Sequence, residues 1–188
     1  MTFFYKLGFI LALGVIIFGL AVKMPVKDTV PPIKETSLER VLRIAAVLRT
    51  ETGLPQLVPV TISVDPSNIL NAYNTGDSIV IYQGLIDKVT NDDELALVIG
   101  HEMSHSTLMH MGDSGLNPSN DPALQSILES QADKMGAIYM MKAGYDICKG
   151  REFFKIMGID PKEADFPKGD DHPSDGYRYK QLNINCGA

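Results

Sequence analysis

Residues 94–105 read ELALVIGHEMSH, an apolar run that ends in a His-Glu-x-x-His pentapeptide. Residues four apart on a helix are separated by only about 40° around its axis. The imidazoles of His101 and His105 therefore point the same way, as two ligands of a tetrahedral zinc site do. Glu102 lies beside them, where it can take a proton from water at the metal. On a buried helix these groups are costly without a metal, which favours zinc over two satisfied core histidines.

A zinc site of this kind needs a third protein ligand. The metzincin pattern has Gly at position 108 and His at position 111, whereas this chain has Leu108 and Met111. A Glu on a later helix is the other route, and Glu129 stands 24 residues beyond His105. Asp133 follows on the same helical face, where it can accept a hydrogen bond from a ligand imidazole. From the residues alone, an exposed acidic pair is the alternative.

The surrounding pattern predicts a mainly helical α+β domain with a small antiparallel or mixed sheet. Capping patterns and apolar periodicity predict long helices over about 36–53, 91–112 and 121–143, with shorter helical pieces at 147–157 and 174–182. Alternating residues 60–64 predict one strand. A turn at 74–77 precedes a second strand, which we expect at a sheet edge, formed by Ser78, Ile79, Val80, Ile81 and Tyr82.

The N-terminus differs in composition from the rest of the chain. Residues 7–22 carry no charge and are flanked by Lys6 and Lys23. The run is either a signal peptide, cleaved after Ala21, or an uncleaved membrane anchor. Either reading exports the remainder to the cell envelope or periplasm. The predicted organisation is an apolar segment at 1–22, a Pro-containing linker at 23–36 and one domain at 37–188.

The net charge limits the classes of partner that we expect, and the cysteines indicate a possible disulfide. The net charge is −6 and no basic stripe is present, so nucleic acid is not an expected partner. The membrane is one, through residues 7–22, if that segment stays in place. Cys148 and Cys186 belong to no Cys-x-x-Cys pair. In an oxidising compartment they can form a disulfide, and two free thiols are the alternative.

Several segments, in a fixed order, carry a resemblance to a known family. They are Asn71-Ala72-Tyr73, Gly84-Leu85, Asp93-Glu94-Leu95-Ala96, the stretch from Gly100 to His105, Glu129-Ser130-Gln131-Ala132-Asp133, Ala143-Gly144-Tyr145-Asp146, and His172-Pro173-Ser174 with Arg178. The chain thereby resembles the gluzincin peptidases that include the HtpX heat-shock protease and the CAAX prenyl endopeptidase. It departs from the usual pattern at Met109-His110, where the family often has Arg before the His.

The resemblance implies a zincin-like fold, with the His-Glu-x-x-His motif on the active-site helix and one Zn²⁺ per chain. The metal ligands it implies are His101, His105 and Glu129. Glu102 would be the general base, and Asp133 would support a ligand. His172 and Arg178 would lie near the cleft and stabilise the transition state, with His172 counted as catalytic. Other members have several membrane helices, whereas this sequence has at most one, so it resembles the compact members with a single exported catalytic domain.

We therefore expect a zinc metalloendopeptidase that hydrolyses peptide bonds in proteins or peptides, chiefly unfolded or misfolded envelope proteins. An extended substrate would add to the strand at 78–82 by β-augmentation. One alternative is a zinc-stabilised, membrane-tethered chaperone-like module that binds without cutting. Another is a hydrolase of a non-peptide bond. Three ligands and a base leave a metal position open for water, which favours an enzyme over a closed structural site.

Overall fold

The computed structural model describes residues 34–52, 61–110, 122–158, 174–184 and 186. The chain divides into two compact units, Met1–Ile33 and Lys34–Ala188, and all described residues belong to the second. The apolar segment 1–22 and most of the linker 23–36 lie outside the described residues. Among the helices that are described, none is long and apolar enough to cross a membrane.

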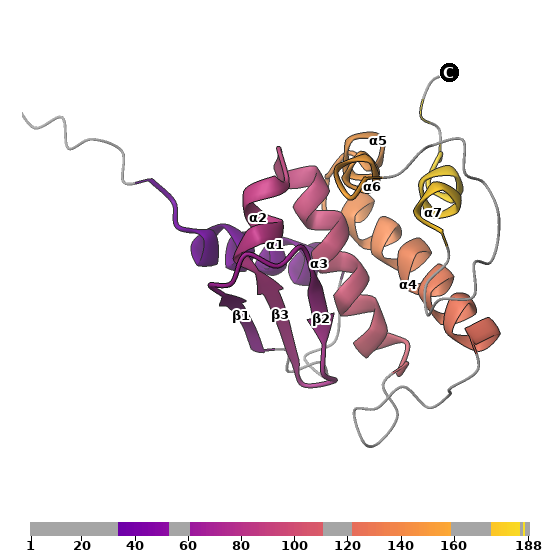
Figure 1. Ribbon diagram of the computed structural model, residues 1–188, viewed down its shortest axis with the longest axis horizontal. Coiled ribbons are helices and arrows are strands. Elements are labelled where there is room, and N and C mark those ends of the chain that lie inside the picture. Colours follow the sequence, from indigo (N-terminus) through magenta and orange to yellow (C-terminus); the bar gives the residue numbers. More distant parts are fainter. Residues whose placement is uncertain (1–33, 53–60, 111–121, 159–173, 185, 187–188) are drawn as a thin grey trace, which may run out of the picture. The chain divides into compact units, whose positions relative to one another are not determined.

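Helix α3 (Asp92–Thr107) lies at the centre of the described domain (Figure 1). Its N-terminus is capped as the sequence predicts, because the Asn91 side chain accepts a hydrogen bond from the Glu94 amide at 3.0 Å. The Glu94 carboxylate turns back to the Thr90 amide at 2.6 Å. Every residue from Glu94 to Gly100 is buried, which confirms the expectation from its apolar surface. The helix packs against α1, α4, α5 and strand β2.

The sheet is mixed, one of the two predicted alternatives, and has the strand order β1-β3-β2. Its strands are β1 (Thr61–Asp65), β2 (Ala72–Asn74) and β3 (Ser78–Tyr82). β1 pairs with β3 in parallel, and β2 pairs with β3 antiparallel. The expectation that Ser78–Tyr82 forms a sheet edge is therefore wrong, because both sides of this strand are hydrogen bonded to a neighbour. The edge next to α3 is β2, a strand that the sequence reading did not predict.

Helix α1 (Ser37–Thr52) begins with the predicted capping box. The Thr36 hydroxyl accepts from the Glu39 amide at 3.2 Å, and the Glu39 carboxylate accepts from the Thr36 amide at 2.8 Å. Its inner face buries Val41, Ile44 and Leu48 completely. Burying each such side chain contributes about 1.5–3 kcal/mol relative to leaving it exposed. This apolar face covers one side of α3.

Helix α4 (Pro122–Lys142) crosses α3 at two glycines. A Cβ added to Gly136 would lie 2.7 Å from the backbone nitrogen of His101 and 2.9 Å from the carbonyl carbon of Gly100. Side chains at these positions would separate the helices, so the glycines allow the backbones to touch. The crossing brings the middle of α4 alongside His101. Gly144, with φ of 84°, follows the end of α4, as the sequence predicts.

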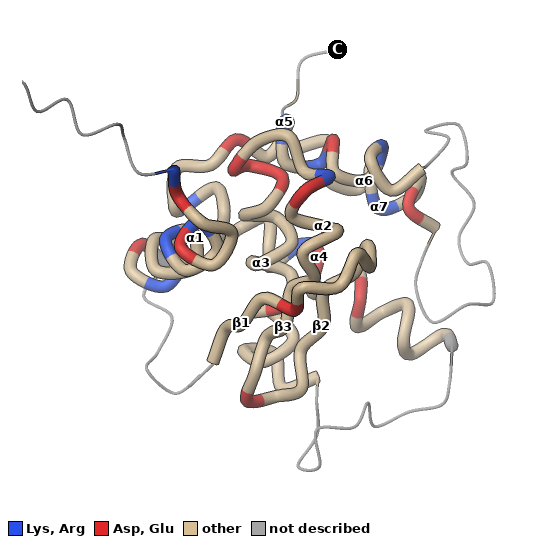
Figure 2. The backbone as a smooth tube through the Cα atoms, turned by 60° about the vertical axis from the view of Figure 1, so that its left-hand side comes forward, with Lys and Arg blue, Asp and Glu red and all other residues tan. Residues whose placement is uncertain are grey.

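The remaining helices are short and complete the domain. They are α2 (Gln83–Lys88), which the sequence reading did not predict, and α5 (Ile147–Gly150), α6 (Phe153–Ile156) and α7 (Asp175–Gln181), which it did. A disulfide joins Cys148 in α5 to Cys186 beyond α7, which resolves the two open readings in favour of a bridge. Figure 2 shows Lys and Arg interspersed with Asp and Glu over the helices, whereas Asp65 of β1 is the only charged residue within the three described strands.

Candidate metal centre

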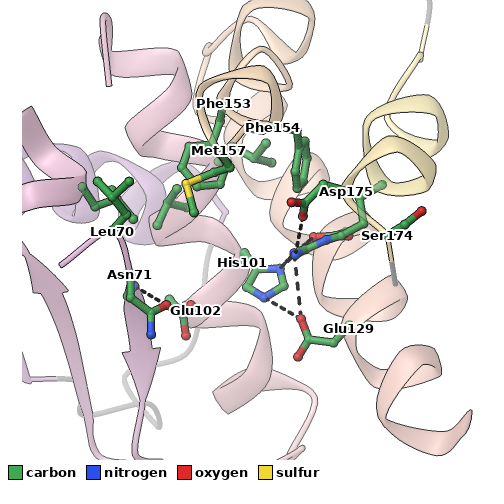
Figure 3. Close-up of a pocket in the computed structure, with 16 residues that line it drawn as sticks. Leu70, Asn71, His101, Glu102, Glu129, Phe153, Phe154, Met157, Ser174 and Asp175 are labelled. Carbon is green, nitrogen blue, oxygen red and sulfur yellow. Dashed lines mark hydrogen bonds and ion pairs between the residues drawn. The ribbon is translucent and has the colours of Figure 1, made fainter. Parts of the chain in front are cut away.

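Three side chains from α3 and α4 converge on one point. The Nε2 atoms of His101 and His105 lie 3.1 Å apart. Glu129 places Oε2 3.2 Å from His101 Nε2 and Oε1 3.3 Å from His105 Nε2. All three side chains are at least 88% buried. Figure 3 shows Glu129 reaching from α4 toward the ring of His101. Among the described residues, these three form the group of ligand-type side chains that could hold a metal ion.

The geometry fits a zinc ion. Ligand atoms about 2.0–2.1 Å from a tetrahedral ion lie about 3.3 Å from one another. The two Nε2 atoms, 3.1 Å apart, lie close to this separation, and each of the two carboxylate oxygens of Glu129 lies 3.2 or 3.3 Å from one of them. Two imidazoles and one carboxylate are also the donor set of known catalytic zinc sites. These residues would hold the ion with a fourth position left for water or substrate.

The outward nitrogen of His101 meets a charged pair. Asp133 Oδ1 lies 2.8 Å from His101 Nδ1. Arg178, from α7, donates to the same carboxylate through Nε at 2.7 Å and through Nη2 at 2.6 Å. The guanidinium also packs over the Phe154 ring, 4.9 Å from its centroid, which holds α7 on α6. Asp133 is thus fixed by two elements while it orients the ring of His101.

These contacts shift the pKa values of the pair. Burial alone would raise the pKa of Asp133, but the charges and hydrogen bonds of Arg178 and His101 lower it to about 2. Burial would lower the pKa of His101, but Asp133 and Glu129 outweigh it and raise the pKa to about 10. In the metal-free chain both ring nitrogens of His101 are therefore protonated at neutral pH, and the ring is positively charged. Because a ligand imidazole must be neutral, His101 would have to release that proton in order to hold zinc.

The outward nitrogen of His105 meets a neutral pair, which sequence reasoning missed. His110 Nδ1 lies 3.1 Å from His105 Nδ1. His110 Nε2 lies 3.2 Å from Oε1 of Gln131, which comes from α4. Burial and the neighbouring His105 lower the pKa of His110. The only signal in the sequence was a His five residues beyond the motif, after the end of the helix.

Glu102 lies on the β2 side of the triad (Figure 3) and is 9% exposed. Burial raises the pKa of its carboxyl group, while the two neighbouring imidazoles oppose the rise. The helix backbone at this point is tied to the sheet by Asn74. Its side-chain amide donates to the carbonyl oxygen of Glu102 and, at 2.7 Å, to the hydroxyl of Ser106. The sequence predicted only a turn at Asn74 and did not indicate these hydrogen bonds to α3.

The triad lies between two cavities, which share Asn71, Ala72, Glu102 and the triad residues His101 and Glu129. The larger has a volume of about 420 Å³. Its wall away from the triad is apolar and consists of Leu70, Leu85, Leu97, Val98, Phe153 and Met157. The smaller has a volume of about 250 Å³ and includes Tyr73, Asn74, His105 and His110. Together they form a cleft with one apolar and one polar end.

Two predicted site residues have different outcomes. His172 lies outside the described residues, so its predicted catalytic role stays a prediction. Arg178 lines the larger cavity. Its Nε and Nη2 atoms are used by Asp133, and Nη1 lies 3.8 Å from Asp175. In the structure Arg178 therefore holds Asp133 in place. That Arg178 also donates a hydrogen bond to a substrate stays a prediction.

A comparison with protein families supplies an identity for this site. The model of peptidase family M48 matches residues 32–128, just over half of the chain. The chain belongs to peptidase family M48. No curated protein and no solved structure matches it. As an M48 peptidase it is a zinc-dependent metallopeptidase, and its His-His-Glu triad is suited to that metal.

The family match and the geometry cover different parts of the site. The matched residues include His101, Glu102 and His105 but end one residue before Glu129. The third ligand and its neighbours on α4 and α7 are therefore assigned by their positions in the structure. The two lines share His101 and His105, and the family match confirms the gluzincin resemblance.

Proposed function

We propose that this M48 peptidase is an exported endopeptidase that cleaves extended segments of unfolded envelope proteins next to a bulky apolar residue. The observation that carries the proposal is the position of the triad. It lies beside the edge strand β2 and opens onto an apolar recess, the wall of the larger cavity formed by Leu70, Leu85, Leu97, Val98, Phe153 and Met157.

Strand β2 offers a place for an extended substrate. Among the described residues it pairs with β3 on one side only. Asn71 and Ala72, at its start, line both cavities. A peptide that adds to this edge gains backbone hydrogen bonds, which do not depend on its side chains. Such a peptide must be extended, and this favours unfolded segments over folded domains.

The recess selects one kind of side chain. The larger cavity, whose apolar wall forms the recess, has a volume of about 420 Å³ and accommodates a Leu, Met or Phe side chain. Folded proteins bury most such residues, whereas unfolded chains expose them. A peptidase with this recess therefore acts on unfolded proteins without recognising a longer sequence.

Glu102 and Asp133 have different proposed roles in hydrolysis. When bound, zinc acts as a Lewis acid and makes water a competent nucleophile at neutral pH. Glu102 is the proposed general base: its carboxylate takes a proton from the attacking water and passes it to the leaving amine. Burial raises the pKa of Glu102 above its ordinary value, which makes the carboxylate a stronger base. Asp133 keeps the Nε2 atom of His101 aimed at the metal position.

Export is supported by two features. The disulfide between Cys148 and Cys186 is stable in an oxidising compartment and rare in the cytoplasm. Residues 7–22 form the uncharged run expected of a signal peptide or an anchor. Both features agree with a catalytic domain that works in the envelope.

The proposal is tested with the full chain, in detergent and with zinc, on unfolded casein and on a stable folded protein. We expect cleavage of casein alone, with cut sites mapped by mass spectrometry next to Leu, Met or Phe. Met157→Asp places a charge in the recess and should slow cleavage at least tenfold. Met141→Asp, at an exposed Met that lines neither cavity, is the matched control. Cut sites without an apolar neighbour, or equal loss in both variants, would refute the recess.

A further inference from the structure

The end of α3 has an unusual residue in a common turn. The His110 amide donates to the carbonyl of His105 at 2.9 Å, and the Met109 amide donates to that of Ser106 at 3.2 Å. This pair of bonds is a Schellman motif, whose penultimate residue is left-handed and usually Gly. Here that residue is Met109, with φ of 56° and its side chain 85% exposed. A left-handed non-glycine residue costs roughly 1–2 kcal/mol, so the turn is held by other contacts.

The side chain after the turn folds back on the last helical turn. In a Schellman motif this residue commonly packs an apolar side chain against the residue five positions earlier. In this chain the two residues are His110 and His105. Their rings meet edge to face, with centroids 5.2 Å apart and an angle of 70°. His110 is only 6% exposed, so its ring nitrogens need partners within the protein.

The positions of the nitrogens fix the order of donors and acceptors. Nε2 of His105 faces His101 and Glu129, so with zinc bound there the hydrogen of this ring would be on Nδ1. That hydrogen points to Nδ1 of His110, 3.1 Å away, which must then be an acceptor. The hydrogen of His110 is consequently on Nε2, 3.2 Å from the Oε1 atom of Gln131. In this series of hydrogen bonds, His105 donates to His110 and His110 donates to Gln131.

We propose that His110 is a positioning residue for the metal ligand His105, and that Gln131 holds His110 in the required tautomer. The inference rests on the zinc site of the proposed function and deepens it. His110 does for His105 what Asp133 does for His101: it fixes the ring and directs Nε2 at the metal. Gln131 lies two residues after the ligand Glu129 on α4. The same helix therefore supplies one metal ligand and the last acceptor in this series of hydrogen bonds.

Two substitutions of His110 separate hydrogen bonding from packing. His110→Phe keeps a ring but removes the acceptor, and we expect zinc affinity to fall tenfold or more. His110→Asn can place Oδ1 where Nδ1 stood and should restore affinity to within about threefold of the parent, although it fills less space. Zinc affinity is measured on the full chain in detergent by competition with a chromophoric chelator. Equal affinity of His110→Phe and the parent would overturn the proposal.

Substitutions of Gln131 avoid the risk of misfolding, because this residue is exposed. Gln131→Leu removes the acceptor for His110 and should lower zinc affinity threefold to tenfold. Gln131→Glu keeps an acceptor and should retain the parent's affinity. Lys134→Leu adds the same side chain at another exposed position of α4 and serves as the control. If Gln131→Leu and Lys134→Leu behave alike, Gln131 has no part in the site.

The tautomer is directly observable. Only four histidines are present, so long-range ¹H–¹⁵N spectra of the zinc-loaded chain can be assigned by substitution. We expect His105 to be protonated at Nδ1 and His110 at Nε2, with the His110 pattern weakened in Gln131→Leu. A His110 protonated at Nδ1 would overturn the proposal. If the parent and His110→Phe bind zinc equally well, only this inference is refuted. If the parent has no zinc affinity, the proposed function is refuted as well.

Discussion

His101 and His105 lie one turn apart on α3, yet their outward nitrogens meet different chemistry. His101 faces the charged arm, Asp133 with Arg178, which comes from α4 and α7. His105 faces the neutral arm, His110 with Gln131, which comes from the end of α3 and from α4. One ligand is thus tied to ionic contacts across three helices, and the other to a short chain of neutral hydrogen bonds.

The difference bears on stability as well as on zinc. A buried ion pair is strongly destabilising when one partner is removed, because the other charge stays behind without compensation. Neutral partners leave only an unsatisfied polar atom, which costs about 1–3 kcal/mol at most. We therefore expect damage to the charged arm to affect folding and metal binding together. Damage to the neutral arm should affect metal binding with a smaller change in stability.

Asp133→Ala should have the largest effect, because it leaves the guanidinium of Arg178 buried without its bidentate partner. We expect a loss of about 3–5 kcal/mol in the free energy of unfolding of the zinc-free chain, measured in urea. The double variant Asp133→Ala with Arg178→Met removes both charges. It should regain part of this stability while zinc affinity stays low. A double variant no more stable than the single one would contradict the ionic account.

Loss of the disulfide should come next. Cys148 and Cys186 are 38 residues apart, and the bridge closes the segment that contains α7. Replacing both with Ser should lower the free energy of unfolding by about 2–4 kcal/mol. Hydrogen exchange should accelerate in α7, which carries Arg178, and stay slow at the His110 amide. Equal acceleration at both places would show that the bridge does not act on the charged arm selectively.

Gly136→Ala should affect both arms at once. The added Cβ would meet the backbone of α3 at 2.7 Å and force α4 away from both histidines. We expect a loss of about 1–3 kcal/mol in stability and weaker zinc binding. Lys134→Ala, an exposed position on the same helix, controls for helix propensity. Unchanged zinc affinity in Gly136→Ala would mean that the close crossing does not position the ligands.

The smallest effect we predict is a pH dependence of the zinc-free chain. The pKa of His101 is raised to about 10 in the folded chain and is near 6.5 in the unfolded chain. Its stabilising contribution is complete below pH 6.5 and is lost as the pH rises toward 10, at about 1 kcal/mol between pH 7 and 8. The pKa of His110 is lowered, so its contribution is lost in the opposite direction, as the pH falls below 6.5.

Urea unfolding of the zinc-free chain at a series of pH values checks this prediction. Stability should decline from pH 7 to pH 8, and Asp133→Asn should flatten the decline, since a carboxylate partner of His101 is gone. A stability that rises over this interval in the parent would show that His101 is not protonated between its two carboxylates.

Some of this architecture was readable in the sequence because it depends on local patterns. The capping box of Thr36 and Glu39, the cap at Asn91 and the buried helix before His101 follow from neighbours within a few residues. The four-residue spacing of the motif fixed two ligands. Glu129 and Asp133 shared a helical face, but only the resemblance favoured them over an exposed pair.

Other parts depend on contacts between distant residues. The run Ser-Ile-Val-Ile-Tyr at 78–82 predicted a strand but carries no information on whether both sides of that strand are paired, so its central place in the sheet was missed. The contact of Arg178 with Asp133 spans 45 residues. The neutral arm requires Met109 in a left-handed conformation, which the identity of that residue gives no reason to expect. The glycines of the α3–α4 crossing, similarly, have meaning only once the two helices meet.

The most direct test of the whole account compares the parent with Glu102→Gln, both as the full chain purified in detergent with zinc. Cleavage of unfolded casein and the zinc content of each protein are measured together. We predict that each holds one zinc per chain and that the variant cleaves at least about a hundredfold more slowly, the usual effect of losing a general base. A variant that cleaves as fast as the parent, or a parent that holds no zinc, would contradict the account.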